Sequence, residues 1–276
     1  MAVSSGARIG TNINAMNAYN ALNNISKKIG TTALRLSTGT RLNQAGDDPA
    51  SFTIARKMQS RSKAIAQAIN NTGDAKSVLA IAEGGLMNIS DILVTIKEKA
   101  SQATNGTFGS DELGAIVTQI NDYFSEIDDI ISQTKFSDQK LLSNNFTNKA
   151  FQVGPDSTDQ ISVSLDTAIS SSDFGLNALT TLNVGSAETI ASIDAAINSV
   201  SMELQYVGSL SNRLDYKETM LGVSQTNIDS AISRVYDADL AKEQMDMMKL
   251  QILQNTATAQ LAQANAAPQQ YLQLFQ

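Results

Sequence analysis

Residues 250–276 contain no charged side chain, and this constrains the chain more than any other feature. Read at heptad spacing, the stretch that begins at Leu240, with Ala238 just before it, places one set of side chains on a single seam: Ala238, Ala241, Met245, Met248, Ile252, Asn255, Ala259, Ala262 and Ala266. Other apolar residues fall off that seam: Met247, Leu250, Leu253, Ala257, Leu261 and Ala264. A helix that is apolar on more than one face is buried on several sides. The sequence therefore predicts that other helices surround this one.

The same stretch is a poor candidate for a transmembrane helix. A membrane span needs about 20 mainly apolar residues, whereas Asn255, Gln260, Gln263 and Asn265 interrupt the apolar run. Small Ala side chains with amides between them favour close helix approach and hydrogen bonding instead. We therefore expect burial in protein and no membrane insertion.

The composition excludes most enzyme chemistry. The chain of 276 residues is 42% hydrophobic, enough to build a core in one or two domains, but it has no Cys, no His and no Trp. Common zinc sites, cysteine nucleophiles, Ser-His-Asp triads and H-E-x-x-H motifs are thereby excluded. The adjacent acid pairs Asp47-Asp48 and Asp128-Asp129 are poor candidates for paired catalytic carboxylates, because neighbours on a helix do not face each other. We expect no enzyme, no metal and no cofactor.

Charge is distributed unevenly along the chain. The net charge is −7, yet the only charges in residues 1–46 are basic: Arg8, Lys27, Lys28, Arg35 and Arg41. A basic arm can bind nucleic acid, but these cations are scattered without interleaved aromatic residues, so we expect no nucleic-acid partner. Residues 1–10 have no Lys/Arg cluster followed by an apolar run, which disfavours a classical secretory signal.

The N-terminal region predicts a coiled-coil helix. Thr11 or Asn12 could cap it, and its apolar seam follows alternating steps of three and four: Ala15, Ala18, Leu22, Ile25, Ile29, Thr32 and Leu36. The seam stops at Gly39, and turn formers follow up to Pro49. Because both ends of the chain carry such seams, we expect the N-terminal and C-terminal helices to pair.

The middle of the chain predicts long helices with one β region. Helical periods cover residues 51–104, a helix that begins at Ser110, and residues 187–235. Short alternating runs at 150–153 and 161–165 indicate strands in a β region at about 136–176. The predicted fold is mainly α: a long antiparallel coiled-coil helical bundle with a small β-hairpin region at one end and paired terminal helices at the other. We expect two domains, residues 1–44 plus 238–276 as a terminal coiled coil and residues 45–237 as the bundle.

Five motifs in order carry a resemblance to bacterial flagellins. Residues 36–50, LSTGTRLNQAGDDPA, resemble the family signature after the first helix, with Arg41, Asn43, Asp47 and Asp48 as its polar members. Further matches are VGSLSNRL at 207–214, SRVYDAD at 233–239, QILQ at 251–254 and LAQAN at 261–265. The chain departs from the family pattern at Ser51, Ser211 and Asn255-Thr256. After Phe174-Gly175-Leu176 it turns straight back, where many flagellins insert large outer domains, so it resembles a minimal form.

The resemblance implies a secreted subunit that polymerises into the bacterial flagellar filament and serves motility. It implies a terminal domain in the filament's inner core, a bundle in the outer tube, and export in an unfolded state. The implied partners are other copies, the flagellar type III export machinery, an export chaperone, the filament cap and hook-associated proteins. We expect the filament core to be packed by Leu22, Ile25, Ile29, Leu36, Met245, Met248, Ile252, Ala259, Ala262 and Ala266.

Physical reasoning adds the mode of assembly. Terminal segments that are apolar on several faces cannot bury themselves within one subunit, so they should fold when neighbours supply the missing faces. A heterologous contact that does not close produces a helical polymer rather than a ring.

Three alternatives stay open at this point. A hook-filament junction protein of the same superfamily would share the terminal seams, although the QILQ and LAQAN tail resembles the filament subunit more. A membrane-inserting helical translocator would explain the charge-free C-terminus. A carboxylate-dependent hydrolase would need paired acids in a cleft.

A final resemblance concerns host recognition. In flagellins detected by the flagellin-sensing Toll-like receptor, the run before the N-G-T turn resembles LQRVRELAVQ, and residues 93–102 here read LVTIKEKASQ. Leu93, Glu98 and Gln102 agree. Thr95 and Lys99 stand at the key Arg and Leu positions, and Gln119 replaces a Glu on the following helix, so we expect weak or absent receptor activation by the monomer.

Overall fold

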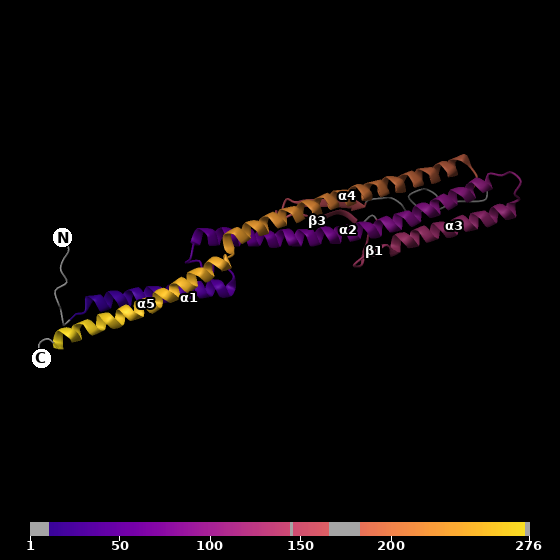
Figure 1. The fold of residues 1–276 in the computed structure, drawn as a ribbon. Coiled ribbons are helices and arrows are strands. Elements are labelled where there is room, and N and C mark those ends of the chain that lie inside the picture. The colour runs from indigo at the N-terminus through magenta and orange to yellow at the C-terminus, as the bar shows by residue number, and fades with distance from the viewer. Residues whose placement is uncertain (1–10, 144–145, 166–182, 274–276) are drawn as a thin grey trace. The chain divides into compact units, whose positions relative to one another are not determined.

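The computed structural model describes residues 11–143, 146–165 and 183–273 (Figure 1). The chain forms two compact units: Met1–Ser60 with Ile228–Gln276, here called unit 1, and Arg61–Asn227, called unit 2. Two long helices, α2 (Pro49–Ala103) and α4 (Ala187–Tyr236), continue from one unit into the other.

Unit 1 is built on a pair of antiparallel helices, α1 (Ile13–Thr38) and α5 (Leu240–Gln273), which lie side by side in Figure 1. Asn12 caps α1 as predicted, because its Oδ1 accepts a hydrogen bond from the Ala15 amide at 3.0 Å. Gly39 ends α1 with φ of 70°, a left-handed conformation that glycine adopts without strain. The pairing of the two ends predicted from sequence is confirmed.

Unit 2 holds one hydrophobic core. Figure 1 shows α3 (Ser110–Gln133) and α4 alongside α2. Lys76 contacts Asp215 at 2.5 Å and Lys97 contacts Asp194 at 2.6 Å, so α2 and α4 run antiparallel. The fully buried large side chains of α2 repeat at helical period: Ile65, Leu79, Leu86, Ile89, Leu93 and Ile96. All of these except Ile65 belong to one cluster with Ile120 and Ile127 of α3 and with Val200, Val207, Leu210 and Leu214 of α4.

Two small antiparallel hairpins follow α3. The first pairs β1 (Lys135–Phe136) with β2 (Gln139–Lys140), and the second pairs β3 (Phe146–Gln152) with β4 (Gln160–Leu165). In β4 the residues Ile161, Val163 and Leu165 are buried while Ser162 is exposed, the alternation expected of a strand with one covered face. The predicted β region is confirmed for the described residues up to 165, and its remainder, residues 166–176, lies outside the described residues.

The larger hairpin lies along α2 rather than beyond its C-terminal end. Asn71 donates from Nδ2 to the carbonyl oxygen of Gln152 at 3.1 Å, and Arg61 approaches Asp156 at 3.9 Å. The opposite end of unit 2 is formed by helix turns, where the Thr104 hydroxyl donates to the Gly185 carbonyl oxygen at 3.5 Å. The sequence predicts a β tip at the end of the bundle away from the termini. In the structure the hairpin instead lies beside the part of α2 that contains Arg61 and Asn71. Its apolar face needs a long surface to cover it, which the side of α2 supplies.

Among the described helices, α2 alone is long and apolar enough to cross a membrane by length and composition. Its apolar side chains line the core of unit 2, and core helices of soluble proteins meet the same criterion.

Candidate assembly surface on the terminal helices

The predicted seam of α1 is the face that packs on α5. Its members Leu22, Ile25, Ile29 and Leu36 are half-buried and Thr32 is buried, while the residues between them are mostly exposed. Since α5 is the helix packed against α1, this face supplies one side of the pair.

The structure differs from the expected pairing on the other side. Met245 is 61% exposed, Met248 49% and Ile252 66%, and Ala259, Ala262 and Ala266 are also exposed. The α5 residues covered by α1 form the neighbouring heptad row: Glu243, Met247, Leu250, Gln254, Ala257, Leu261 and Ala264. The expectation that the seam through Met245 meets the α1 seam within one chain is therefore wrong. The covered row allows polar contacts at both ends of the pair, whereas its apolar side chains are no larger than those of the seam through Met245.

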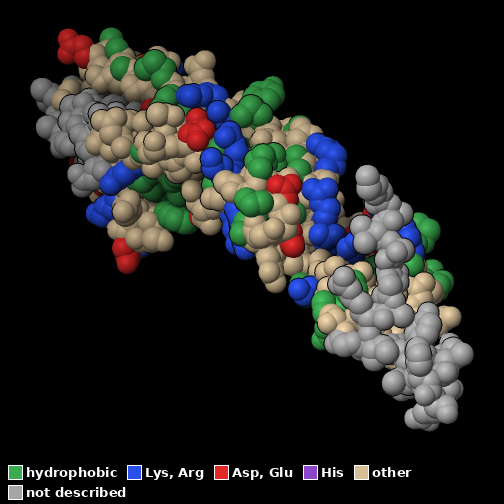
Figure 2. All heavy atoms as spheres, turned by 90° about the vertical axis from the view of Figure 1, so that its left-hand side faces the viewer, with side chains coloured by type: hydrophobic (Ala, Val, Ile, Leu, Met, Phe, Trp, Pro, Cys, Tyr) green, Lys and Arg blue, Asp and Glu red, His purple; other side chains and the backbone are tan. Residues whose placement is uncertain are grey.

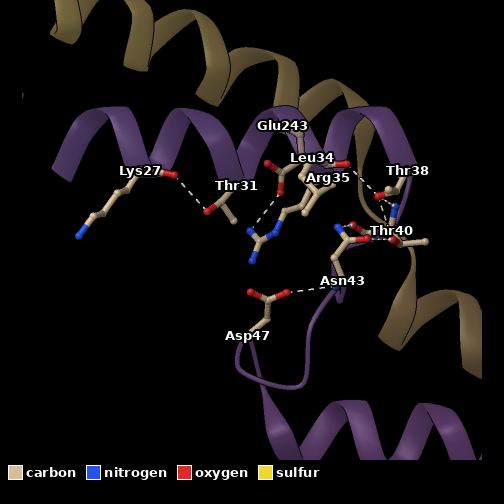
Figure 3. A network of polar contacts seen from close by, with 9 residues as sticks. All are labelled: Lys27, Thr31, Leu34, Arg35, Thr38, Thr40, Asn43, Asp47 and Glu243. Atoms are coloured by element: carbon tan, nitrogen blue, oxygen red, sulfur yellow. Dashed lines mark hydrogen bonds and ion pairs between the residues drawn. The ribbon is translucent and has the colours of Figure 1, made fainter. Parts of the chain in front are cut away.

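Those polar contacts fix the register of the pair. Near one end, Asn12 donates from Nδ2 to the carbonyl oxygen of Ala264 at 2.6 Å. Near the other end, Arg35 Nη1 lies 3.5 Å from Glu243 Oε1, with 28% and 13% of the side chains exposed (Figure 3). Both contacts involve residues of the covered row, so moving α5 onto its other seam would break them.

Apolar side chains stay exposed on both helices. They include Ile13, Met16 and Tyr19 on α1, each at least 50% exposed, and Met245, Met248, Ile252 and Leu253 on α5, while Leu34 and Leu240 near the other end of the pair are exposed as well. Figure 2 shows apolar side chains reaching the surface among polar ones. Two helices can cover only one face of each other, so this set, here called the open apolar surface, is left without cover in a single subunit.

The signature after α1 forms a compact polar turn (Figure 3). Asp47 Oδ2 accepts hydrogen bonds from the amides of Asn43 and Gln44 at 3.1 and 3.0 Å. Asn43 in turn donates from Nδ2 to the Thr40 carbonyl oxygen at 3.1 Å and accepts from the Thr40 hydroxyl at 2.8 Å. Asn43 and Asp47 therefore hold the chain as it turns from α1 toward α2.

The turn also contacts the second signature, at residues 233–239. The Arg41 amide donates to the Tyr236 carbonyl oxygen at 2.7 Å, and Arg41 Nη2 donates to the Val235 carbonyl oxygen at 2.9 Å. The Ala238 amide donates to the Gly39 carbonyl oxygen at 2.9 Å. Two motifs that are far apart in the sequence thus form one short antiparallel bridge.

Two aspartates begin the helices that leave this bridge. Asp48 Oδ1 accepts from the amides of Ala50 and Ser51 at the start of α2, and Asp239 Oδ1 accepts from the amides of Ala241 and Lys242 at the start of α5. Hydrogen bonds from the Ser51 side chain and amide lower the pKa of Asp48 below its ordinary value of 3.8. Sequence reasoning missed the role of Asp239, although an Asp directly before the first residue of a helix is a recognisable cap signal.

The residues equivalent to the receptor surface lie in unit 2. Thr95 and Lys99 are half-buried on α2, and Thr95 donates from its hydroxyl to the Asp91 carbonyl oxygen at 3.0 Å. Gln102 on α2 and Gln119 on α3 are exposed.

No group of three or more acidic side chains within the described ranges is arranged to hold a metal ion. The polar network at the signature turn is built of backbone contacts and helix caps, and the covered row and the open apolar surface are packing features. The arrangement therefore supports contact between helices rather than chemistry on a substrate.

Comparison with known proteins agrees with the motifs. Residues 9–147 match the bacterial flagellin N-terminal helical region, and residues 190–275 match the bacterial flagellin C-terminal helical region. The flagellin of Bacillus subtilis is 33% identical over 97% of this chain and 99% of its own length. The flagellar filament 33 kDa core protein of Treponema phagedenis is 30% identical over 97% of this chain and 99% of its own length. A putative flagellar hook-associated protein from Vibrio parahaemolyticus shares the fold, with a TM-score of 0.55 and 16% identity over 69% of this chain and 100% of that chain.

The two family matches together span most of the sequence, and the relatives align over nearly their whole length. Flagellins are structural proteins of the extracellular flagellar filament, and the comparisons place this chain among them rather than among enzymes. The chain belongs to the bacterial flagellin family, and it is a subunit that polymerises into the flagellar filament.

Proposed function

We propose that this filament subunit assembles by packing its terminal helices against those of other copies, so that the folding of the ends and polymerisation are one event. The observation that carries the proposal is the open apolar surface, above all Met245, Met248 and Ile252, which α1 leaves uncovered. Covering such side chains removes apolar area from water, at about 25 cal/mol per Å². In the single subunit α1 covers only one face of α5, so these side chains keep their exposure to water.

The residues expected to pack the filament core then divide into two roles. Leu22, Ile25, Ile29 and Leu36 hold α5 within the subunit, since they form the half-buried α1 face. The α5 seam of Met245, Met248, Ile252, Ala259, Ala262 and Ala266 contacts neighbouring subunits. The three alanines are small enough to allow close approach of another helix.

The proposed domain roles follow the signature turn. Residues 1–44 with 238–276 form the inner core of the filament, and residues 45–237 form its outer tube without inserted outer domains. The bridge between Thr40 and Asp237 supports a boundary at this place, because it joins the segment between α1 and α2 to the segment between α4 and α5.

The proposed partners follow from the same surface. The chain is exported unfolded by the flagellar type III machinery, with a chaperone to shield the terminal segments and a cap to receive them at the filament end. Hook-associated proteins with matching terminal helices join the filament to its base. Exposed methionines and isoleucine on α5 support the need for shielding before assembly.

Truncation tests the proposal. Removal of residues 1–39 or of residues 240–276 should leave a folded, soluble unit 2 that does not polymerise, because each truncation removes one helix of the pair. Circular dichroism would report folding, and negative-stain microscopy after seeding would report filaments, with the full chain as control. Filaments of normal diameter from either truncated protein would contradict the terminal-packing proposal.

A further inference from the structure

One face of α4 in unit 2 exposes large apolar side chains that its own core does not use. Tyr216 is 79% exposed, Met220 56% and Val223 60%, and their spacing of four and three residues places them on one side of the helix. Leu210, Leu214 and Leu221 are buried on the opposite side. These three exposed residues together with Arg213 are here called the α4 face.

Arg213 belongs to the VGSLSNRL motif, and the core explains only part of that motif. Val207, Leu210 and Leu214 are buried in unit 2, whereas Arg213 is exposed one turn before Tyr216. Within the described residues, Arg213 makes no ion pair and its side chain makes no hydrogen bond. A guanidinium beside Tyr and Met is the composition enriched at protein interfaces.

A second face of complementary charge lies on α2. Met87 is 51% exposed and Val94 54%, and the exposed carboxylates Asp91 and Glu98 lie on the same side of the helix. These four residues, here called the α2 face, are opposite the buried Leu86, Ile89, Leu93 and Ile96. At about 1.5 Å per residue, the α4 face and the α2 face each extend along roughly 15 Å of helix.

We propose that the α4 face of one copy docks on the α2 face of a second copy, a contact that rests on the filament function and assigns a second interface to it. Charge complementarity selects the occupant, because the unpaired Arg213 meets Asp91 or Glu98 while Tyr216, Met220 and Val223 cover Met87 and Val94. The two faces differ, so the contact is heterologous and repeats from copy to copy without closing. It lies wholly in unit 2, apart from the terminal helices.

Cysteine cross-linking tests this contact directly, because the chain has no cysteine of its own. Filaments of the double variant Met87→Cys/Tyr216→Cys should, on mild oxidation, give a ladder of covalently linked subunits on a non-reducing gel. A one-to-one mixture of the two single variants should give linked dimers and no longer species. The matched control Lys63→Cys/Tyr216→Cys, with an exposed cation of α2 outside the α2 face, should give monomers.

Absence of a ladder from filaments of the double variant would overturn the proposal. Dimers from Tyr216→Cys alone would overturn it too, since they would show that two α4 faces meet. Filaments are counted by microscopy before oxidation, so a failure of terminal packing, which removes the filaments, is distinguished from a failure of this contact, which removes only the cross-link.

Charge reversal supplies an independent readout. Arg213→Glu should raise the critical concentration for polymerisation by about tenfold or more, and Arg213→Glu/Asp91→Arg should recover most of that loss. Lys63→Glu, the matched control, should leave the critical concentration unchanged. A double variant that assembles no better than Arg213→Glu, when the monomers give the same circular dichroism, would contradict the assigned pairing.

Discussion

At the scale of single residues, the polar side chains of this subunit position helices rather than perform chemistry. Asp47 and Asn43 form the turn after α1, Arg41 joins it to the segment before α5, and Asp48 begins α2. Each of these contacts reaches a backbone amide or carbonyl group. Such contacts depend on the length of the side chain and on its charge, so even conservative substitutions at these positions should change the stability of the fold measurably.

The cap at Asp48 predicts a pH dependence. Because the folded-state pKa is lowered below 3.8, ionised Asp48 stabilises the fold above the unfolded-state value, and this stabilisation is lost as the pH falls through the folded-state pKa. Asp48→Asn keeps a cap acceptor but loses the charge. The wild-type chain should therefore have the higher midpoint of thermal unfolding at pH 7, and the difference should shrink by pH 3. Circular dichroism melts at the two pH values check this, and a constant difference would show that the charge is not involved.

The receptor surface gives a second prediction at this scale. We propose that the monomer activates the flagellin-sensing Toll-like receptor weakly, because Thr95 replaces an Arg anchor and Lys99 places an ammonium where an apolar side chain should be desolvated. Arg anchors at interface centres commonly contribute about 2 kcal/mol or more. Thr95→Arg with Lys99→Leu and Gln119→Glu should restore activation in part. A reporter-cell assay measures it, and strong activation by the unmodified chain would refute the proposal.

At the scale of elements, unit 2 is held by a core that extends along α2 from Ala75 to Ala103. Side chains at helical period on α2 are fully buried, and ion pairs at Lys76 and Lys97 fix α4 beside them. The neighbouring glycines of α2 show how sharply this environment changes around one helix. A Cβ at Gly84 would meet open space, whereas a Cβ at Gly85 would lie 2.8 Å from Thr134 Oγ1 and 3.0 Å from Leu142 Cδ1.

This contrast predicts opposite effects for two adjacent substitutions. Gly84→Ala should raise the free energy of unfolding by up to about 1 kcal/mol, because alanine restricts the unfolded chain and favours helix. Gly85→Ala should lower it by about 1 to 3 kcal/mol through overpacking. Urea unfolding of the monomeric variants measures both values. Equal effects from the two substitutions would mean that the crowding at Gly85 relaxes freely.

At the scale of the whole molecule, the two units differ in how completely they bury their apolar side chains. Unit 2 has a continuous core, while unit 1 buries few residues, among them Leu42, Ala55 and Ala257. A unit of the second kind depends on other copies for its cover, which suits a subunit whose ends become ordered within a polymer.

The alanine seam of α5 tests this dependence. Ala259 is exposed in the subunit, so Ala259→Glu should leave the unfolding of the monomer unchanged. In a filament the same carboxylate would be buried without a partner, which costs several kcal/mol per subunit. Polymerisation should fail, while Ala259→Ser, a small neutral control, should assemble. Light scattering against protein concentration gives the critical concentration, and an unchanged value for Ala259→Glu would contradict the assignment.

What the sequence determined by itself is local. Asn12 and Gly39 mark the bounds of α1, Leu240 marks the start of α5, and the heptad spacing of Leu22, Ile25 and Ile29 identifies the face of α1 that packs. Caps, glycine conformation and helical period all act between residues a few positions apart, so they can be read directly along the chain. The order of the flagellin motifs is likewise a property of the sequence.

Only the tertiary structure decided which apolar row of α5 faces α1 and where the β3–β4 hairpin lies. The row through Leu250 and Leu261 is covered because Arg35 meets Glu243 and Asn12 meets Ala264 in that register, and no periodicity distinguishes it from the row through Met245. The hairpin lies along α2 because Asn71 reaches Gln152, 81 residues away in the sequence. Such contacts exist only after the helices have paired, since each depends on two segments whose separation in space is set by the packing of everything between them.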